Sequence, residues 1–186
     1  TYPINLTNSQ FYTTTRYFIP KPTYSIAEKL DCYIRWDLDN SWQEIPGDGC
    51  IELWFQGFEL LSDRMLFRKV ADVSANGGYD LRVTQAGELK FQVNGPTGYI
   101  GFSITSPINY VSMFNWHHVA VTRENNVNRL YMDGFLVGSA TSTSPWTGNG
   151  KFVLGRNDLD DNNTLTHFFW RGVMQDLRVT RGRAKY

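Results

Sequence analysis

The chain has 186 residues, enough for one domain that buries a sizeable apolar core. Its 18 basic and 18 acidic side chains cancel, so no basic field is present to attract nucleic acid or an anionic membrane. No apolar stretch approaches the ~20 residues that a membrane-spanning helix requires. Aromatic residues make up 15% of the chain, which supplies rings for a core and for a surface.

Short apolar or alternating runs, separated by turn residues, predict a series of β-strands. The first run is cut by Pro20 and Pro22, which suits an edge strand. Residues 50–58 are apolar on both faces, which suits a central strand. Residues 94–109, rich in Gly, Pro, Ser and Thr, are predicted to form the longest loop. Strands are predicted at residues 11–19, 31–38, 50–58, 64–71, 79–84, 89–93, 116–123, 127–132, 135–137, 151–156 and 167–180.

Residues 116–140 predict an antiparallel meander of three strands. Asp133-Gly134 lies between two apolar runs, and this pair favours a type I′ hairpin because both central residues need positive φ. Alternation in 116–123 places Val119 and Val121 on the core face, with Arg123 where the strand runs out into solvent. We expect Trp116 to be largely buried beside these valines or across the sandwich from them.

The last predicted strand contains Gly172, which suggests a bulge or bend. No helical period persists for three turns, so the chain is predicted to be all-β, a sandwich or a barrel. Cys32 and Cys50 fall in separate predicted strands and are too few for a zinc site. We favour two buried free thiols over a disulfide, although the geometry could permit a bridge.

Several segments in this order resemble the laminin-G-like branch of the concanavalin A-like lectin/glucanase superfamily: CIELWFQ, GGYDLRVTQAGELKFQV, WHHVAVTR, LYMDG, FVLGRND and FWRGVMQDLRVTRGRAKY. The resemblance spans residues 49–186, and residues 1–48 are less diagnostic. It implies a single domain over residues 1–186, folded as a two-sheet antiparallel jelly roll with one concave sheet. The ending DLRVTRGRAKY is especially similar to laminin-G-like domains of bacteriophage virion proteins, where the chain usually runs on. We therefore expect a domain of a longer protein.

Some relatives on this fold hydrolyse glucans, with two glutamates and an aspartate alternating on one strand. The nearest set here, Glu44, Asp48 and Glu52, is spaced by four residues around Pro46-Gly47 and cannot share one strand face. Three aspartates within residues 31–39 alternate in part but lack glutamate. A Ser-His-Asp site is unsupported because no G-x-S-x-G motif occurs. We predict no catalytic residue and no enzymatic activity.

Two histidines and one acidic loop are candidate metal ligands. His117 and His118 are adjacent in a strand, so they point to opposite faces and are expected to be half-buried with local hydrogen bonds. The loop 157–164 offers hard oxygen ligands of the kind that calcium prefers, and laminin-G-like domains often carry a rim calcium. Its spacing matches no EF-hand, and a solvated turn without metal is the favoured interpretation. The candidate calcium ligands are Asp158, Asp160 and Asp161, beside Asn157, Asn162 and Asn163.

Aromatic residues on loops are candidate sugar-binding groups, because sugar C–H faces pack on rings. Tyr99 and Trp146 lie in loops rich in Gly, Pro and Ser, and they are the candidate carbohydrate-binding residues. The alternative is that each ring folds back to cap an end of the sandwich. We favour that alternative for Trp42.

Together these features predict a non-enzymatic binding module of a phage virion, in a tail fibre, receptor-binding or capsid-decorating protein, that recognises host surface carbohydrate. The alternative is a structural virion subunit that packs on other virion proteins, or on copies of itself, without binding sugar. A eukaryotic extracellular adhesion domain is the third interpretation. Each places the protein on a virion or outside a cell, with no nucleic acid bound and no membrane insertion.

Overall fold

The computed structural model describes residues 10–12, 33–36, 43–69, 77–95, 100–148, 150–156 and 169–186, the first two segments by their backbone only. Its strands are β1 (Gln10–Tyr12), β2 (Tyr33–Trp36), β3 (Gly49–Gly57), β4 (Arg64–Lys69), β5 (Tyr79–Val83), β6 (Leu89–Asn94), β7 (Ile100–Thr105), β8 (Trp116–Glu124), β9 (Val127–Met132), β10 (Phe135–Thr141), β11 (Phe152–Leu154) and β12 (Gly172–Arg181). Among the described residues no helix is long and apolar enough to cross a membrane.

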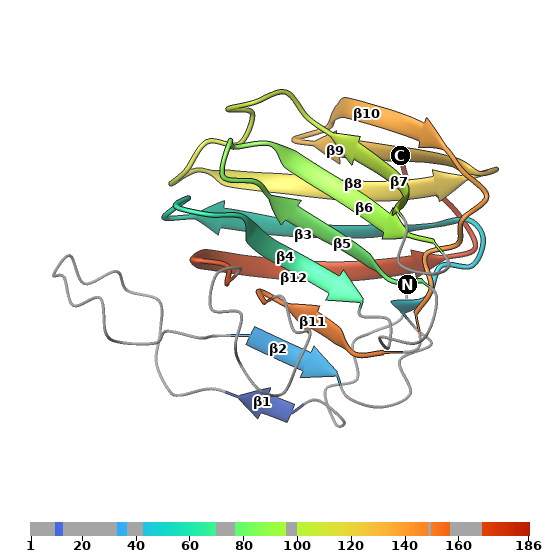
Figure 1. Ribbon diagram of the computed structural model, residues 1–186, viewed down its shortest axis with the longest axis horizontal. Helices are drawn as coiled ribbons and strands as arrows, with labels where there is room; N and C mark the ends of the chain where they lie inside the picture. Colours follow the sequence, from blue (N-terminus) through green and yellow to red (C-terminus); the bar gives the residue numbers. More distant parts are fainter. Residues whose placement is uncertain are drawn as a thin grey trace, which may run out of the picture.

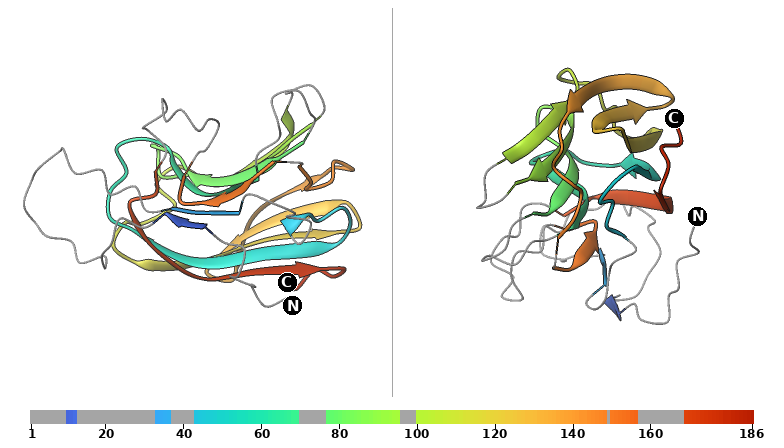
Figure 2. Two further views of the ribbon diagram at one scale, coloured as in Figure 1. Left: turned by 90° about the horizontal axis from the view of Figure 1, so that it is seen from below. Right: turned by 90° about the vertical axis from the view of Figure 1, so that its right-hand side faces the viewer.

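The described strands form two antiparallel sheets packed face to face (Figures 1 and 2). The seven-stranded sheet has the order β1-β2-β11-β4-β5-β6-β7, and the five-stranded sheet has the order β10-β9-β8-β3-β12. Figure 1 looks onto the outer face of the seven-stranded sheet, with the other sheet behind it. In the left view of Figure 2, β5 and β6 bend away from the five-stranded sheet, which makes this outer face concave. The all-β jelly-roll prediction is confirmed.

The predicted hairpins are confirmed. Asp133 and Gly134 have φ values of 52° and 84°, as a type I′ turn requires, and β10 pairs with β9. Asn125 and Asn126, with φ values of 49° and 65°, close the β8–β9 hairpin in the same way. The predicted edge strand is β1, at the margin of its sheet, and the predicted central strand is β3, between β8 and β12.

The core lies between the sheets and is built by strand alternation. Every second residue of β3 and β8 points toward the seven-stranded sheet, whose own alternate residues point back. Aromatic rings stack through the layer, with Phe67 and Phe152 5.9 Å apart between ring centres. The fully buried core side chains include Ile51, Leu53, Phe55, Phe67, Tyr79, Leu81, Val83, Leu89, Phe91, Val93, Val121, Leu130 and Phe152.

The predictions for the two ends of β8 are wrong. Trp116 is 42% exposed, because Val119 and Val121 face the core and Trp116 belongs to the other face of the strand. Arg123 is buried rather than solvated. Its guanidinium donates to Asn126 Oδ1 and to the Thr143 carbonyl, so these local acceptors hold the strand end inside the fold.

Two further predictions need correction. Residues 100–105 form β7 rather than part of a loop, because Phe102 and Ile104 alternate toward the core despite the Gly and Ser between them. Gly172 begins β12 instead of interrupting it, and the bulge lies between Gln175 and Arg178. A Cβ at Gly172 would lie 1.9 Å from the Gln56 carbonyl oxygen, so only glycine fits there.

Cys50 is a buried free thiol on β3, as we favoured. Burial raises its pKa to about 12, and nearby Glu52 adds to the shift, so the group stays a neutral thiol at ordinary pH. Cys32, which we also expect to be a buried free thiol, lies outside the described residues.

Candidate functional site

The outer face of the seven-stranded sheet is lined by polar side chains. Tyr79, Leu81 and Val83 of β5 point into the core, so Asp80 and Arg82 point outward onto the concave side. The strand register places residues of β4, β6 and β7 beside them. We call this set the concave polar face: Arg68, Asp80, Arg82, Lys90, Gln92, Asn94, Ser103 and Thr105.

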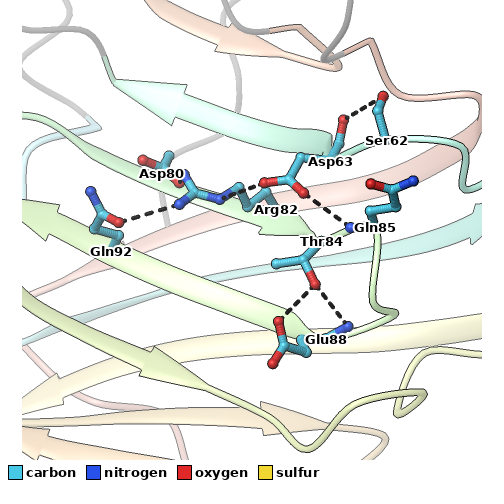
Figure 3. Close-up of polar contacts among 8 residues, drawn as sticks. All are labelled: Ser62, Asp63, Asp80, Arg82, Thr84, Gln85, Glu88 and Gln92. Atoms are coloured by element: carbon cyan, nitrogen blue, oxygen red, sulfur yellow. Dashed lines mark hydrogen bonds and ion pairs between the residues drawn. The ribbon is translucent and has the colours of Figure 1, made fainter.

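Arg82 is the centre of a hydrogen-bonded network on this face (Figure 3). Its Nη1 lies 2.7 Å from Asp80 Oδ1, and its Nη2 donates to Gln92 Oε1 across 3.3 Å. Its Nε lies 3.5 Å from Asp63 Oδ2. Gln92 in turn donates to Asn94 Oδ1 across 2.9 Å. The network fixes the planes of the guanidinium and of the amide, so the hydrogen-bonding groups stand in set directions before any ligand arrives.

Asp80 is nearly inaccessible, with 3% of its surface exposed. Burial raises the pKa of its carboxyl group, while Arg82, Arg68 and Lys90 oppose that shift. A buried carboxylate is stable only beside a compensating cation, and the guanidinium of Arg82, 2.7 Å from Asp80 Oδ1, is that cation. The pair therefore forms a rigid floor, from which the less buried Gln92 and Asn94 extend to the surface.

The connection between β5 and β6 continues this polar surface (Figure 3). Asp63 Oδ1 accepts from the Gln85 amide across 3.0 Å, which ties the β3–β4 connection to the turn. Thr84 Oγ1 lies 2.9 Å from Glu88 Oε2 and accepts from the Glu88 amide across 3.2 Å. Beside Asp63, Ser62 Oγ donates to its carbonyl at 3.4 Å. These contacts fix one end of the concave polar face.

The loop aromatics predicted to bind sugar lie elsewhere. Trp146 is 0% exposed, so the prediction that it binds carbohydrate is wrong and the capping alternative is right. It bridges to Ile45, its indole Nε1 donates to Asn128 Oδ1 across 2.9 Å, and its ring meets Phe91 edge-on at 4.8 Å. Tyr99 and Trp42 lie outside the described residues.

The calcium candidate, loop 157–164 with Asp158, Asp160 and Asp161, also lies outside the described residues. In the part of the chain that the structure describes, no group of three His, Cys, Asp or Glu side chains could hold a metal ion. A calcium site in that loop stays a prediction.

His117 and His118 face opposite sides of β8, as predicted. His117 Nδ1 lies 2.7 Å from Asp133 Oδ2, and Nε2 lies 2.9 Å from Ser112 Oγ and 3.0 Å from the Ser112 carbonyl oxygen. These three side chains have the connectivity of a hydrolytic triad. A carboxylate only accepts, so Nδ1 carries a hydrogen, and Nε2 of a neutral ring accepts from Ser112 Oγ. We assign the ring a structural role, because it ties the loop before β8 to the β9–β10 turn.

Glu52, one of the carboxylates compared with glucanases, lies on the outer face of the five-stranded sheet. It accepts from Lys185 Nζ and Tyr186 Oη, and His118 Nε2 lies 3.5 Å away. Burial would raise its pKa, but the hydrogen bonds from Lys185 and Tyr186 bring it below its ordinary value. Asp48 accepts instead from the Asn125 amide across 2.9 Å. Both carboxylates thus accept hydrogen bonds from parts of the chain that are distant in the sequence.

A family model described as the concanavalin A-like lectin/glucanases superfamily matches residues 32–183. The chain belongs to this superfamily. This membership accords with the two antiparallel sheets and the concave outer face. No curated protein matches the chain.

Solved structures share this fold at low sequence identity. Domains LG4-5 of the mouse laminin α1 chain match with a TM-score of 0.59 and 16% identity, over 82% of this chain and 40% of that one. Domain 4 of an extracellular arabinanase from Geobacillus stearothermophilus, in complex with arabinotriose, matches with a TM-score of 0.58 and 19% identity. The match covers 82% of this chain and 68% of that one. A carbohydrate-binding module of a Ruminococcus gnavus sialidase, bound to α2,3 sialyllactose, matches with a TM-score of 0.55 and 18% identity. The match covers 71% of this chain and 77% of that one. At these identities the likeness shows the fold alone.

The sequence analysis did not single out Asp80, Arg82 or Gln92, although the signal was present. The strands predicted at 79–84 and 89–93 pair in the structure, which places residues 80 and 82 on one face, beside residues 90 and 92. These residues are polar, whereas the odd ones are apolar, which marks a sheet face that meets water. The candidate site lies on strands, whereas the aromatic residues predicted to bind sugar lie in loops.

Proposed function

We propose that this domain is a carbohydrate-binding module and that the concave polar face holds the sugar. The observation that carries the proposal is the fixed network of Arg82, Asp80 and Gln92. Sugar hydroxyls donate and accept at once, so a surface that presents guanidinium and amide groups in set directions suits them. Domain 4 of an arabinanase and a carbohydrate-binding module of a sialidase, which carry sugars in their structures, support the same class of function by their fold.

The proposed module does not catalyse. On the concave polar face and its rim, Asp80 and Asp63 both contact Arg82, so they hold the guanidinium in place instead of flanking a scissile bond. This pairing supports a binding role over glycoside hydrolysis.

We further propose a phage virion as the setting, with host surface glycan as the ligand in a tail fibre, receptor-binding or decoration protein. The support is the similarity of DLRVTRGRAKY, at residues 176–186, to phage laminin-G-like domains. The alternative function is a structural virion subunit that packs on other virion proteins or on copies of itself. A calcium ion in the loop 157–164 is part of the proposal as an aid to sugar binding, because laminin-G-like domains often carry a rim calcium.

A glycan array, read in calcium and in chelator, tests this function. The purified domain should give a saturable signal that falls by about tenfold or more in Arg82→Met and Gln92→Ala. Arg129→Met is the matched control, because Arg129 lies on β9 of the other sheet, with its Nη1 3.7 Å from Glu124 Oε2. Binding that persists in chelator would support the sugar site and contradict a role for calcium. A blank array would favour the structural subunit.

A further inference from the structure

The outer face of the five-stranded sheet, on the other side of the sandwich from the concave polar face, carries two solvent-exposed tryptophans. Trp54 of β3 is 39% exposed and Trp116 of β8 is 42% exposed. The register places Trp54 between His118 of β8 and Gln175 of β12, and it places Trp116 opposite Gln56 of β3. Each exposed indole therefore lies beside a glutamine of a neighbouring strand.

Further rings extend this surface across the sheet. The ring centres of Trp54 and His118 lie 5.1 Å apart, those of His118 and Tyr186 6.0 Å apart, and those of Tyr186 and Tyr131 6.0 Å apart. Tyr186 is held over the strands by its hydroxyl, which donates to Glu52. The buried carboxylate thus fixes the position of a ring that the C-terminal segment contributes.

Phe114 is held at one end of this surface in an unfavourable backbone conformation. Its φ is 64°, uncommon for a bulky residue, and its side chain is 68% exposed. The Phe114 amide donates to the Gly57 carbonyl, and Gln56 Nε2 donates to the Phe114 carbonyl, each across 2.7 Å. Its ring stacks on Phe58 at 6.2 Å. A strained backbone that holds an aromatic ring exposed to solvent indicates a functional role for that ring.

We propose that this aromatic outer face is a second carbohydrate-binding surface, separate from the concave polar face. The rings of Trp54 and Trp116 stack on the C–H faces of an extended, uncharged oligosaccharide, while Gln56 and Gln175 hydrogen-bond its hydroxyls. The chemistry favours a sugar over a protein partner, because an amide or imidazole flanks each exposed indole. The fully buried core of a protein interface is instead more apolar than the surface around it.

Fluorine NMR of the fluorotryptophan-labelled domain tests this surface directly. The chain has six tryptophans, and single Trp→Phe variants assign the Trp54 and Trp116 signals. We expect millimolar hexaoses of glucose, mannose, galactose or N-acetylglucosamine to shift both signals saturably while that of the core Trp146 stays fixed. Trp54→Ala and Trp116→Ala should each weaken binding by about tenfold. Unchanged thermal unfolding would show that these variants still fold.

Phe135→Ala is the matched control, because Phe135 is also exposed but lies opposite the core-facing Met132 and so on the other face of the sheet. It should bind as the wild type does. Trp54 and Trp116 signals that ignore all four sugars would overturn the proposal, as would signals that move only with protein concentration, which would indicate contact between copies. The readout is local to these two tryptophans, so failure here differs from failure of the concave-face site.

Discussion

Trp146 and Asn128 meet inside the sandwich, where the indole Nε1 donates to the amide Oδ1 across 2.9 Å. Asn128 in turn donates from Nδ2 to the carbonyls of Asn126 and Ala140, each across 3.2 Å. A loop residue and a strand residue thus satisfy each other's polar atoms without water. The contact explains how the 141–148 segment is fixed over one end of the core.

Replacing Trp146 with Ala should lower the free energy of unfolding by about 3–5 kcal/mol, as for other large buried aromatics. Trp116→Ala should cost less than about 1 kcal/mol, because that ring is partly exposed. Urea denaturation of both variants checks the ranking. Equal losses in the two would show that the burial of Trp146, or the exposure of Trp116, is wrong.

Removal of the Glu52 carboxylate should release the C-terminal segment. Glu52→Gln weakens the hydrogen bonds from Lys185 and Tyr186, so we expect a loss of about 1–2 kcal/mol near neutral pH. The pKa of Glu52 is lowered on folding, so this stabilisation is present above the unfolded pKa of about 4.3. It disappears as the pH falls through the lower, folded pKa.

Chemical denaturation across pH 3–7, roughly the range over which carboxyl groups titrate, tests this account. Glu124→Gln is the control, because the Glu124 carboxylate is half exposed and lies 3.7 Å from Arg129, so its loss should cost no more than about 0.5 kcal/mol. A Glu52→Gln variant as stable as this control at neutral pH would contradict the role assigned to the carboxylate.

Lys69 should make the protein more stable at alkaline pH. Burial lowers its pKa to about 8, with Glu44 acting in the opposite direction, and Nζ donates to Gln43 Oε1 across 3.2 Å. Above that pH the folded protein has released a proton that the unfolded chain keeps up to about pH 10, so raising the pH favours the folded state. Stability relative to Lys69→Met should rise by roughly 2–3 kcal/mol between pH 8 and 10. Parallel curves for the two proteins would refute the depressed pKa.

Ser112 should not react as a nucleophile. We expect the contacts of His117 with Asp133 and Ser112 to be structural, because they join the loop before β8 to the β9–β10 turn and no G-x-S-x-G motif surrounds the serine. A fluorophosphonate probe should therefore label the wild type no more than Ser112→Ala. Labelling that needs both Ser112 and His117 would make the arrangement a working triad.

Much of the fold could be predicted from local sequence. Asp133-Gly134 fixed a turn because few residue pairs tolerate two positive φ values, and alternation in β5 and β8 identified the core faces. Strand β7 was missed because its Gly and Ser suggested a loop, although Phe102 and Ile104 still alternate. Composition outweighed periodicity in that prediction.

The site was less predictable for a physical reason. Trp146 lies in a polar loop, and its contacts with Ile45, Phe91 and Asn128, all distant in the sequence, hold it in the core. The alternation in β5 does show that Asp80 and Arg82 share a face. That this face is concave depends on the curvature of the whole sheet, which no local pattern reports.

The most direct test of the sugar-binding claim is a map of backbone amide shifts in the isotope-labelled domain, recorded with a glycan that the array selects. We expect saturable shifts in residues 80–82 of β5 and 90–94 of β6, and we expect Arg82→Met to abolish them. Shifts confined to other segments, with β5 and β6 unchanged, would contradict a sugar site on the concave polar face.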